Sequence, residues 1–457
     1  MAMGRQESGQ QEIWVATHDL PKSQGHPFYR KLNKVLAESG FDRLVEELCE
    51  PHYAKAGRPS VPPGVYFRML LVGYFEGIDS QRGIAWRCAD SLSLKEFLGY
   101  GVTDETPDHS SLTYIRKRLP LEVHHQVFLH VLGIADKKKL LKGKTVATDS
   151  TTLEANAAMK SIVLKETGED WKEYLTRLAR EAGIEDPTDE DLRRFDKKRK
   201  NKKVSNKDWQ SKTDHDSRIT KMKDGRTHLA YKAEHTVDLE TDLVLSAEVH
   251  RADRGDPETL LEAVIGAQLN RMLSQSEAVI QDAAADKGYH STENVAVLEG
   301  LSVRTYIPEK QLRGRRKWKD QPSDYRKAYY ANRRRVKGKR GRRLQRKRSE
   351  MTERSFAHVC ETGGARRTWL RGVENINKRY LIQVAARNLG RIMRHIFRVG
   401  TPRSLQGERM PQFGVFSALK VALASLWRRW APELPLPVRL EHFFACRTQI
   451  GIGAAPG

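Results

Sequence analysis

Residues 144–149 read KTVATD, and this run predicts a short β-strand that ends on an acid. Further strand patterns follow at residues 227–233, 235–249, 279–286 and 302–307, with a hairpin turn at 238–242. Among them, Asp256-Pro257-Glu258 begins a helix, because Asp can cap a helix and Pro suits its first turn. Strands that alternate with crossover helices indicate an α/β fold with a mixed sheet and flanking helices.

The chain has 457 residues, and its pattern changes near Gly143. Residues 1–140 predict an all-helical N-terminal domain, with Asp79 and Ser80 as candidate caps of one helix and Thr106-Pro107-Asp108 as the start of another. Basic residues on its last helices, such as Arg116, are typical of a helix-turn-helix unit that binds DNA, and a helical bundle used for dimerisation fits the same pattern. The other expected parts are an α/β domain at 141–400 with a charged insertion at about 160–225 and a basic segment at 313–348, and a tail at 401–457 with one helix.

The net charge of +23 is concentrated in two internal segments. Residues 313–348 hold 18 lysines and arginines against two aspartates, and six of the seven residues at 197–203 are basic. The rest of the chain is close to neutral. Dense runs of like charge repel themselves, so we expect them to be poorly ordered until a polyanion neutralises them. They predict contact with nucleic acid, the alternative being a merely solvated surface.

Other classes of protein are disfavoured by what the sequence lacks. The four cysteines, at positions 49, 88, 360 and 446, are too few and too scattered for a disulfide framework or a zinc site, which indicates a reducing compartment. No apolar run approaches the length that a membrane span needs, and the N-terminal residues do not resemble a signal peptide. We therefore expect a cytoplasmic protein with no membrane partner.

Three acids lie where predicted elements begin or end. Asp149 closes the first strand, Asp286 closes a later strand, and Glu353 opens the helix after the basic segment. The dipeptide Lys287-Gly288 follows Asp286, and glycine there permits a sharp turn. Carboxylates at the strand ends of an α/β sheet commonly line its ligand crevice, although an Asp at a strand end is also a common turn residue.

Converging carboxylates repel one another unless a cation lies between them. Hard oxygen ligands favour Mg²⁺ or Mn²⁺, and two such ions can activate a water molecule and stabilise the leaving oxygen of a phosphodiester. The sequence therefore predicts a site for two divalent ions, whereas its histidines form no metal-ligand pattern. Spacing alone leaves other acids open as members of the group, namely Asp282, Asp214, Asp216, Asp253 and Asp256.

Four segments carry a resemblance to a known family: ATDSTTLEANA (147–157), GRTHLAYKAEHTVDLET (225–241), ADKGYHS (285–291) and ERSFAHVCETGGARRTWLRG (353–372). In this order they resemble the DDE transposases of bacterial insertion sequences, in particular the insertion-sequence four/five superfamily with its ribonuclease-H-like catalytic domain. The stretch from His26 to Leu119 is similar to the helical domain that precedes this core.

The resemblance implies that Asp149, Asp286 and Glu353 are the catalytic, metal-binding triad. It also implies metal-dependent strand cleavage at the element's ends, joining of the freed 3′-hydroxyl to target DNA, a homodimer on DNA and a location at the bacterial nucleoid. Some members carry Tyr, Arg and Lys around the Glu. Those positions hold Arg346, Ser349 and Cys360 here, so no hairpin intermediate is inferred.

Basic residues near these motifs and in the two cationic segments are the candidate DNA contacts, since arginine and lysine bind phosphate. They are Arg116, Lys198, Lys200, Lys287, Arg333, Arg334, Arg335, Arg340, Arg346, Arg348, Arg354, Arg366 and Arg367. Two other functions stay open: a nuclease of the same fold that does not rejoin strands, and a DNA-binding protein without catalysis.

Overall fold

The structure is a computed structural model that describes residue 16, residues 25–198, 206–222 and 225–311, residue 318 and residues 321–405. The described residues up to Pro402 form one compact unit. Lys200 and the helix expected within the tail 401–457 lie outside the described residues. No helix in the described ranges is both long and apolar enough to cross a bilayer.

The N-terminal part is helical, as the sequence predicts. The side chain of Ser80 accepts a hydrogen bond from Gly83 N (3.0 Å), so Ser80, and not Asp79, caps α4. Asp108 accepts from Ser110 N (2.8 Å), so the helix predicted at Thr106-Pro107-Asp108 begins there. The helices are α1 (Pro27–Glu38), α2 (Phe41–Cys49), the short turn η1 (Glu50–His52), α3 (Pro63–Glu76), α4 (Gln81–Ala89), α5 (Leu92–Leu98), α6 (His109–Arg118) and α7 (Leu121–Lys137).

A mixed sheet follows, with the strand order β4-β5-β1-β7-β8 and with β6 also paired to β5. β1 runs antiparallel to β5 and parallel to β7, and β7 runs parallel to β8. The strands are β1 (Thr145–Glu154), β4 (Arg218–Lys221), β5 (Thr227–Asp238), β6 (Val244–Arg251), β7 (Asp282–Ala285) and β8 (Arg304–Tyr306). The predicted hairpin turn between β5 and β6 is confirmed.

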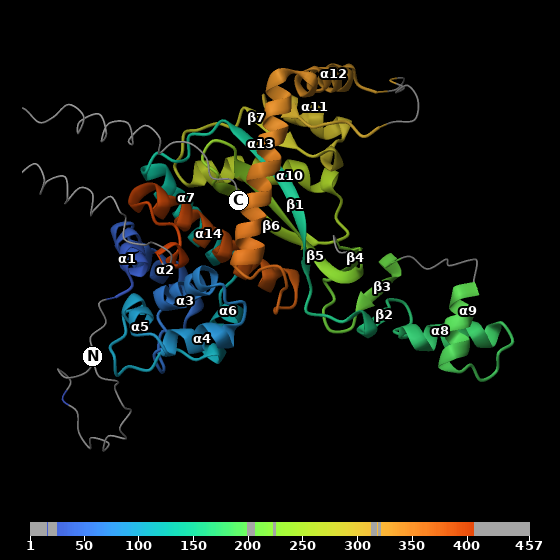
Figure 1. The fold of residues 1–457 in the computed structure, drawn as a ribbon, viewed down its shortest axis with the longest axis horizontal. Coiled ribbons are helices and arrows are strands. Elements are labelled where there is room, and N and C mark those ends of the chain that lie inside the picture. The colour runs from blue at the N-terminus through green and yellow to red at the C-terminus, as the bar shows by residue number, and fades with distance from the viewer. Residues whose placement is uncertain are drawn as a thin grey trace, which may run out of the picture. The chain divides into compact units, whose positions relative to one another are not determined.

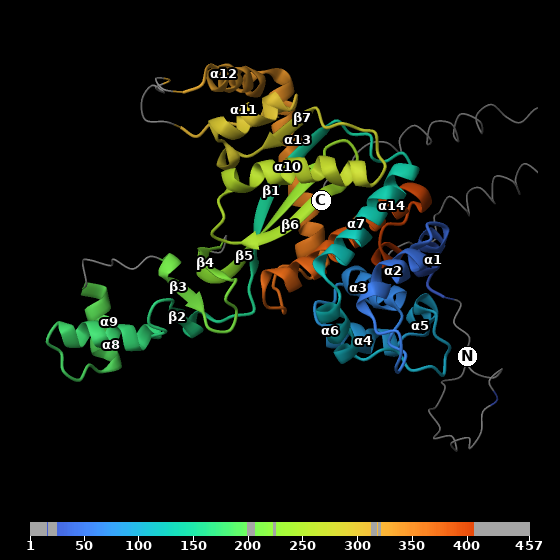
Figure 2. The ribbon, with the colours of Figure 1, turned by 180° about the vertical axis from the view of Figure 1, so that it is seen from behind.

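Helices cover both faces of this sheet (Figures 1 and 2). One face packs on α10 (Asp256–Leu273), whose Ala263 carbonyl accepts a hydrogen bond from Thr236 of β5. The other face packs on α13 (Lys339–Phe356) and α14 (Val373–Phe397), which bind His235 of β5 through Ser355 and Tyr380. Layers of helix, mixed sheet and helix confirm the predicted fold class, which is consistent with a ribonuclease-H-like core.

The edge of β6 is covered by side chains of α14. Asn377 donates to the carbonyl of Val249 (2.8 Å) and accepts from its amide (2.7 Å). Asn388 makes the same pair of bonds with Val244, at 2.8 and 3.0 Å. Since an open strand edge carries unpaired backbone groups, the two asparagines satisfy part of an edge that could otherwise recruit another strand.

The described part of the basic segment, residues 323–348, is more ordered than the charge density predicts. Residues Ser323–Lys337 form α12, and residues 339–348 belong to the next helix, α13. Arg335 donates to both carboxylate oxygens of Glu299, at 3.1 and 2.6 Å, and to the carbonyl of Thr305. Arginine favours helices, and such pairs offset part of the repulsion, so this part of the run needs no nucleic acid to be helical.

Smaller elements complete the core and the insertion. Between β7 and α12 lie the turn η4 (Lys287–Tyr289) and α11 (Thr292–Gly300), and the π-helical turn η5 (Ala357–Thr362) follows α13. The short helix η6 (Pro402–Leu405) ends the described chain. The insertion after β1 contains η2 (Met159–Ser161), β2 (Ile162–Leu164), α8 (Trp171–Glu181), α9 (Asp189–Lys198), η3 (Asn206–Asp208) and β3 (Trp209–Ser211).

Candidate active site and nucleic-acid surface

The first two predicted acids come together at one edge of the parallel strands. The pairing of β1 with β7 ends at Thr148 and Ala285, so Asp149 and Asp286 both follow directly from it. β1 continues to Glu154 along β5 alone, so Asp149 lies within the strand rather than at its end as predicted. Parallel strands that end side by side place their next side chains at one crevice.

Arg348 of α13 links the two aspartates. Its Nη1 lies 2.6 Å from Asp149 Oδ2, and its Nη2 lies 3.9 Å from Asp286 Oδ1. Thr352, one helical turn later, donates to the same Asp149 oxygen (3.0 Å). Burial raises the pKa of the Asp149 carboxyl, although the Arg348 guanidinium acts in the opposite direction. Both carboxylates therefore face one cationic group, which offsets their mutual repulsion.

Glu353 is placed differently from the prediction. It lies in the last turn of α13, not at the start of a helix, because the basic segment is itself helical. Its carboxylate is exposed and accepts a hydrogen bond from Ser349 (3.4 Å). Adjacent residues of a helix point about 100° apart. Thr352 therefore faces Asp149, and Glu353 points away from it toward solvent.

One group of metal-ligating side chains with ligand atoms within 4.8 Å occurs among the described residues, and it is Glu248, His250 and Glu262. Asp149, Asp286 and Glu353 do not form a group this tight. Arg254 already lies within the first group, 3.1 Å from Glu262 and 3.3 Å from His250 Nδ1. Glu262 and His250 therefore already have a partner, and we assign the group no role.

The competing acids have structural partners. Asp282 is 1% exposed and pairs with Arg304 (2.7 Å) and Arg340, which leaves it no access to a substrate. Asp214 accepts from Tyr231 and Gly372, Asp216 accepts from Val373 at the start of α14, and Asp253 pairs with Arg218. These contacts favour Asp286 over Asp282 as the second acid.

A buried polar network lies on the face of the sheet that packs on α10, and it supports β1 and β7. Glu234 of β5 is 2% exposed and accepts hydrogen bonds from Tyr289 (2.7 Å) and Thr259 (2.8 Å). Lys232 pairs with Asp256 (2.8 Å), whose carboxylate also accepts from Ser150, the neighbour of Asp149. Tyr289 thus anchors the turn that begins at Asp286.

This network was missed from the sequence, although Lys232 and Glu234 gave a signal. Both are charged, and because they lie two residues apart in a strand, their side chains share one face of it. Most residues next to them in the sequence are apolar. Gly288 also has a different role from the one predicted. Its φ is not positive, so its backbone conformation does not require glycine. A Cβ at this position would lie 2.5 Å from Asp256 Oδ2, so glycine is needed there because it leaves space for the Asp256 carboxylate.

The predicted DNA contacts divide by exposure. Arg116 is a correction: it is 8% exposed, because this side of α6 packs into the unit, and it presents no charge to a ligand. Arg335 and Arg340 are held in ion pairs with Glu299 and Asp282. Arg354 pairs with Glu350, and Arg366 pairs with Glu361. The exposed members of the predicted set are Lys198, Lys287, Arg333, Arg334, Arg340, Arg346 and Arg367. Among these, Arg333 also pairs with Glu309 and Arg367 with Glu154.

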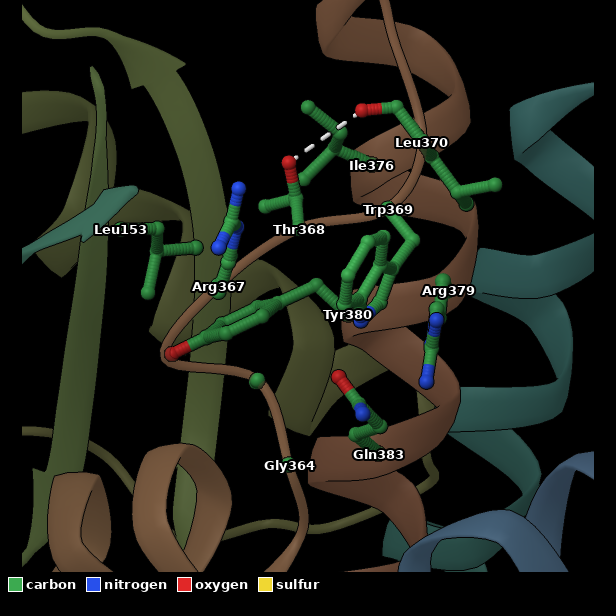
Figure 3. Close-up of a pocket in the computed structure, with 11 residues that line it drawn as sticks. Leu153, Gly364, Arg367, Thr368, Trp369, Leu370, Ile376, Arg379, Tyr380 and Gln383 are labelled. Atoms are coloured by element: carbon green, nitrogen blue, oxygen red, sulfur yellow. Dashed lines mark hydrogen bonds between the residues drawn. The ribbon is translucent and has the colours of Figure 1, made fainter. Parts of the chain in front are cut away.

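The loop after η5 forms a small pocket with α14 and Leu153 of β1 (Figure 3). None of the predicted acids lines this pocket. Trp369 donates to Asp79 of the N-terminal part (2.7 Å), and the Arg367 guanidinium lies 5.1 Å from the centre of the Trp369 ring. The loop therefore holds an exposed arginine and an exposed aromatic ring near the end of β1.

Two family profiles match the chain. One, described as "Transposase domain (DUF772)", covers residues 16–118, and the other, described as "Transposase DDE domain", covers residues 199–389. Together the two matches place the chain in the family of DDE transposases of insertion sequences. The first match falls on the N-terminal helices, and the second includes Asp286 and Glu353 but begins after Asp149. No curated protein and no solved structure matches the transposase significantly.

Proposed function

We propose that this transposase cleaves DNA at the ends of its insertion sequence and joins the freed 3′-hydroxyl to target DNA, with divalent metal held by Asp149, Asp286 and Glu353. The convergence of Asp149 and Asp286 on one cationic group, where the pairing of β1 with β7 ends, is the observation that carries the proposal. Carboxylate oxygens are the ligands that Mg²⁺ and Mn²⁺ prefer, so the donors fit the ions.

The side chains would act as follows. In the first step, water attacks the phosphodiester and a 3′-hydroxyl leaves; in the second, that hydroxyl attacks a target phosphodiester and a new bond replaces the old one. A bound pair of divalent ions lowers the pKa of the attacking group and neutralises the leaving oxygen. Asp149 and Asp286 would hold the ions, and Glu353, which points to solvent in this structure, would have to turn toward them to join the site.

DNA would lie across the exposed basic residues. Lys287 follows Asp286 directly, and Arg346 lies on the same helix as Glu353. Arg333 and Arg334 extend the positive surface along α12. Phosphate contacts of this kind fix the position of the backbone without reading its sequence. By the same family argument, two protomers would pair the two ends of the element.

The test uses the full chain, Mg²⁺, duplexes that carry the DNA flanking the reading frame, and a target plasmid. We expect nicked ends followed by covalent joining, and we expect Asp149→Asn to retain DNA but to cleave nothing. Cleavage without joining would indicate the nuclease instead. DNA retention without cleavage by the unsubstituted chain would indicate a binding protein, and unchanged cleavage by Asp149→Asn would refute the site.

A further inference from the structure

The chain has its own cation at the proposed metal site. The Arg348 guanidinium binds the Asp149 oxygen that a metal ion would need, and it faces Asp286 as well. We propose that Arg348 exchanges partners: it neutralises the aspartate pair until a divalent ion binds, and the released guanidinium then binds a DNA phosphate. The proposal rests on the proposed function, because it takes Asp149 and Asp286 as the metal-binding pair.

The position of Arg348 is built by the chain. Its Nε donates to Gln345 Oε1 (3.1 Å), and the amide of Gln345 donates to the carbonyls of Ala285 (3.2 Å) and Tyr306 (2.5 Å). These carbonyls belong to the parallel strands β7 and β8. The side chain is 12% exposed, against 25% for Asp149. Arg348 is therefore fastened to the sheet, not a surface arginine that happens to meet an acid.

Arg348 and a metal ion must compete for the same oxygen. Asp149 Oδ2 accepts from both Arg348 and Thr352, and its other oxygen accepts from the amide of Ser150 (2.9 Å). A divalent ion carries twice the charge of the guanidinium, and it would repel a guanidinium bound to the same carboxylate oxygen. Binding of the ion therefore breaks the Arg348–Asp149 pair. The free energy needed to break that pair makes the free energy of metal binding less favourable, so the metal binds more weakly than it would without Arg348.

Once released, Arg348 needs another anion. Its ion pairs within the described ranges are those with Asp149 and Asp286, and metal binding takes both of these partners away. A DNA phosphate beside the two aspartates is the anion that the proposed reaction brings to the site, and arginine binds phosphate with paired hydrogen bonds. Metal and DNA then favour each other's binding, and linkage makes the effect equal in both directions.

The first experiment measures Mn²⁺ binding to the full chain by titration calorimetry without DNA. We expect Arg348→Ala and Arg348→Gln to bind Mn²⁺ about 5–150 times more tightly than the unsubstituted chain, the range typical of coupling between sites. Arg343→Ala is the matched control, since Arg343 is an exposed arginine on the same helix, and its affinity should not change. Equal or weaker binding by both Arg348 variants would overturn the proposal.

The second experiment measures the affinity for a flanking-DNA duplex with and without Ca²⁺. The ion should raise the affinity of the unsubstituted chain and of Arg343→Ala, and it should raise that of Arg348→Gln by a smaller factor. An equal factor in all three would refute the exchange of partners. Mn²⁺ affinity of Asp149→Asn separates the two proposals, because an unchanged value removes the metal site itself, whereas a loss leaves only the role of Arg348 in question.

Discussion

Two aspartate–arginine pairs of the core differ in how far solvent reaches them. Asp238 Oδ2 lies 3.0 Å from Arg271 Nη2, and both side chains are 0% exposed. The Asp149–Arg348 pair has a similar separation, but its side chains are 25% and 12% exposed. The first pair joins the end of β5 to α10, where no ligand can reach it. The second can exchange partners, and this is the property that a catalytic site requires.

Asp149→Asn gives the largest expected effect. It removes the charge that binds the metal, and loss of several kcal/mol of transition-state stabilisation lowers the rate of strand cleavage by about a thousandfold or more. The free energy of unfolding should change little, because burial already disfavours the charged carboxyl. Cleavage and urea unfolding are measured on the same preparation. A large loss of stability would place Asp149 with the buried pairs.

Arg271→Ala should act in the opposite way. It leaves the Asp238 carboxylate buried without its countercharge, which costs about 3–5 kcal/mol of unfolding free energy. Urea unfolding measures this loss, with Arg343→Ala as the control for removing an exposed arginine. A cost below about 1 kcal/mol would mean that exposure does not distinguish the two pairs.

The buried His124 tests, at a third site, how burial without solvent access affects an ionisable group. Burial lowers its pKa to about 4 from an ordinary value of 6.5. Between these values the unfolded chain takes up a proton that the folded chain refuses, so stability falls as the pH drops from about 6.5 to 4, by up to about 3 kcal/mol. His124→Gln should flatten this dependence in urea unfolding at several pH values. An unchanged slope would assign the acid sensitivity to other groups.

Tyr289→Phe tests whether the network beneath the site acts on it. Loss of the hydroxyl removes one hydrogen bond from buried Glu234 and should cost about 1–2 kcal/mol of stability. It should also weaken Mn²⁺ binding by about 10–100-fold, since the turn that carries Asp286 loses its anchor. Tyr114→Phe is the control, because it removes the same hydroxyl from an exposed tyrosine of α6. Unchanged metal binding would make the network purely structural.

The smallest effect is expected at exposed arginines. Replacing Arg333 and Arg334 by Ala should lower the slope of log affinity against log salt by about 1 for each phosphate that the variant no longer neutralises. The affinity for all DNA sequences should fall together. Filter binding at several salt concentrations measures the slope. The same double substitution should not alter urea unfolding, and an unaltered slope would exclude α12 from the DNA surface.

Residue type and order predicted the fold class and the neighbourhood of the first two acids. KTVATD and ADKGY each read as a strand that meets an acid, and parallel neighbours bring such acids together. The assignment of the triad, by contrast, stays a prediction. The face that a helical residue presents could not be predicted, because it depends on which side of the helix packs. Arg346 is exposed and Arg348 binds Asp149, two positions apart on one helix.

The exposure of basic residues also depends on packing in the N-terminal part and in the basic segment. Arg116 belongs to a basic triplet, and packing alone decides that it is buried while its neighbour Lys117 is exposed. The order of the basic segment depends on acids far away in the sequence, such as Glu299, which pairs with Arg335. Charge density measures repulsion within a run, but it says nothing of partners that the fold supplies.

Helix α14 packs both on β6 and on the N-terminal helices α3 and α7, and Lys378 reaches from it to the carbonyl of Arg116. The boundary that the sequence draws near residue 140 is therefore no hinge. If the helical part binds a sequence motif at the transposon end, its fixed position relative to the sheet sets the number of base pairs between that motif and the nick. An insertion between the motif and the end of the element would therefore leave the nick at the same distance from the motif, inside the element instead of at its end.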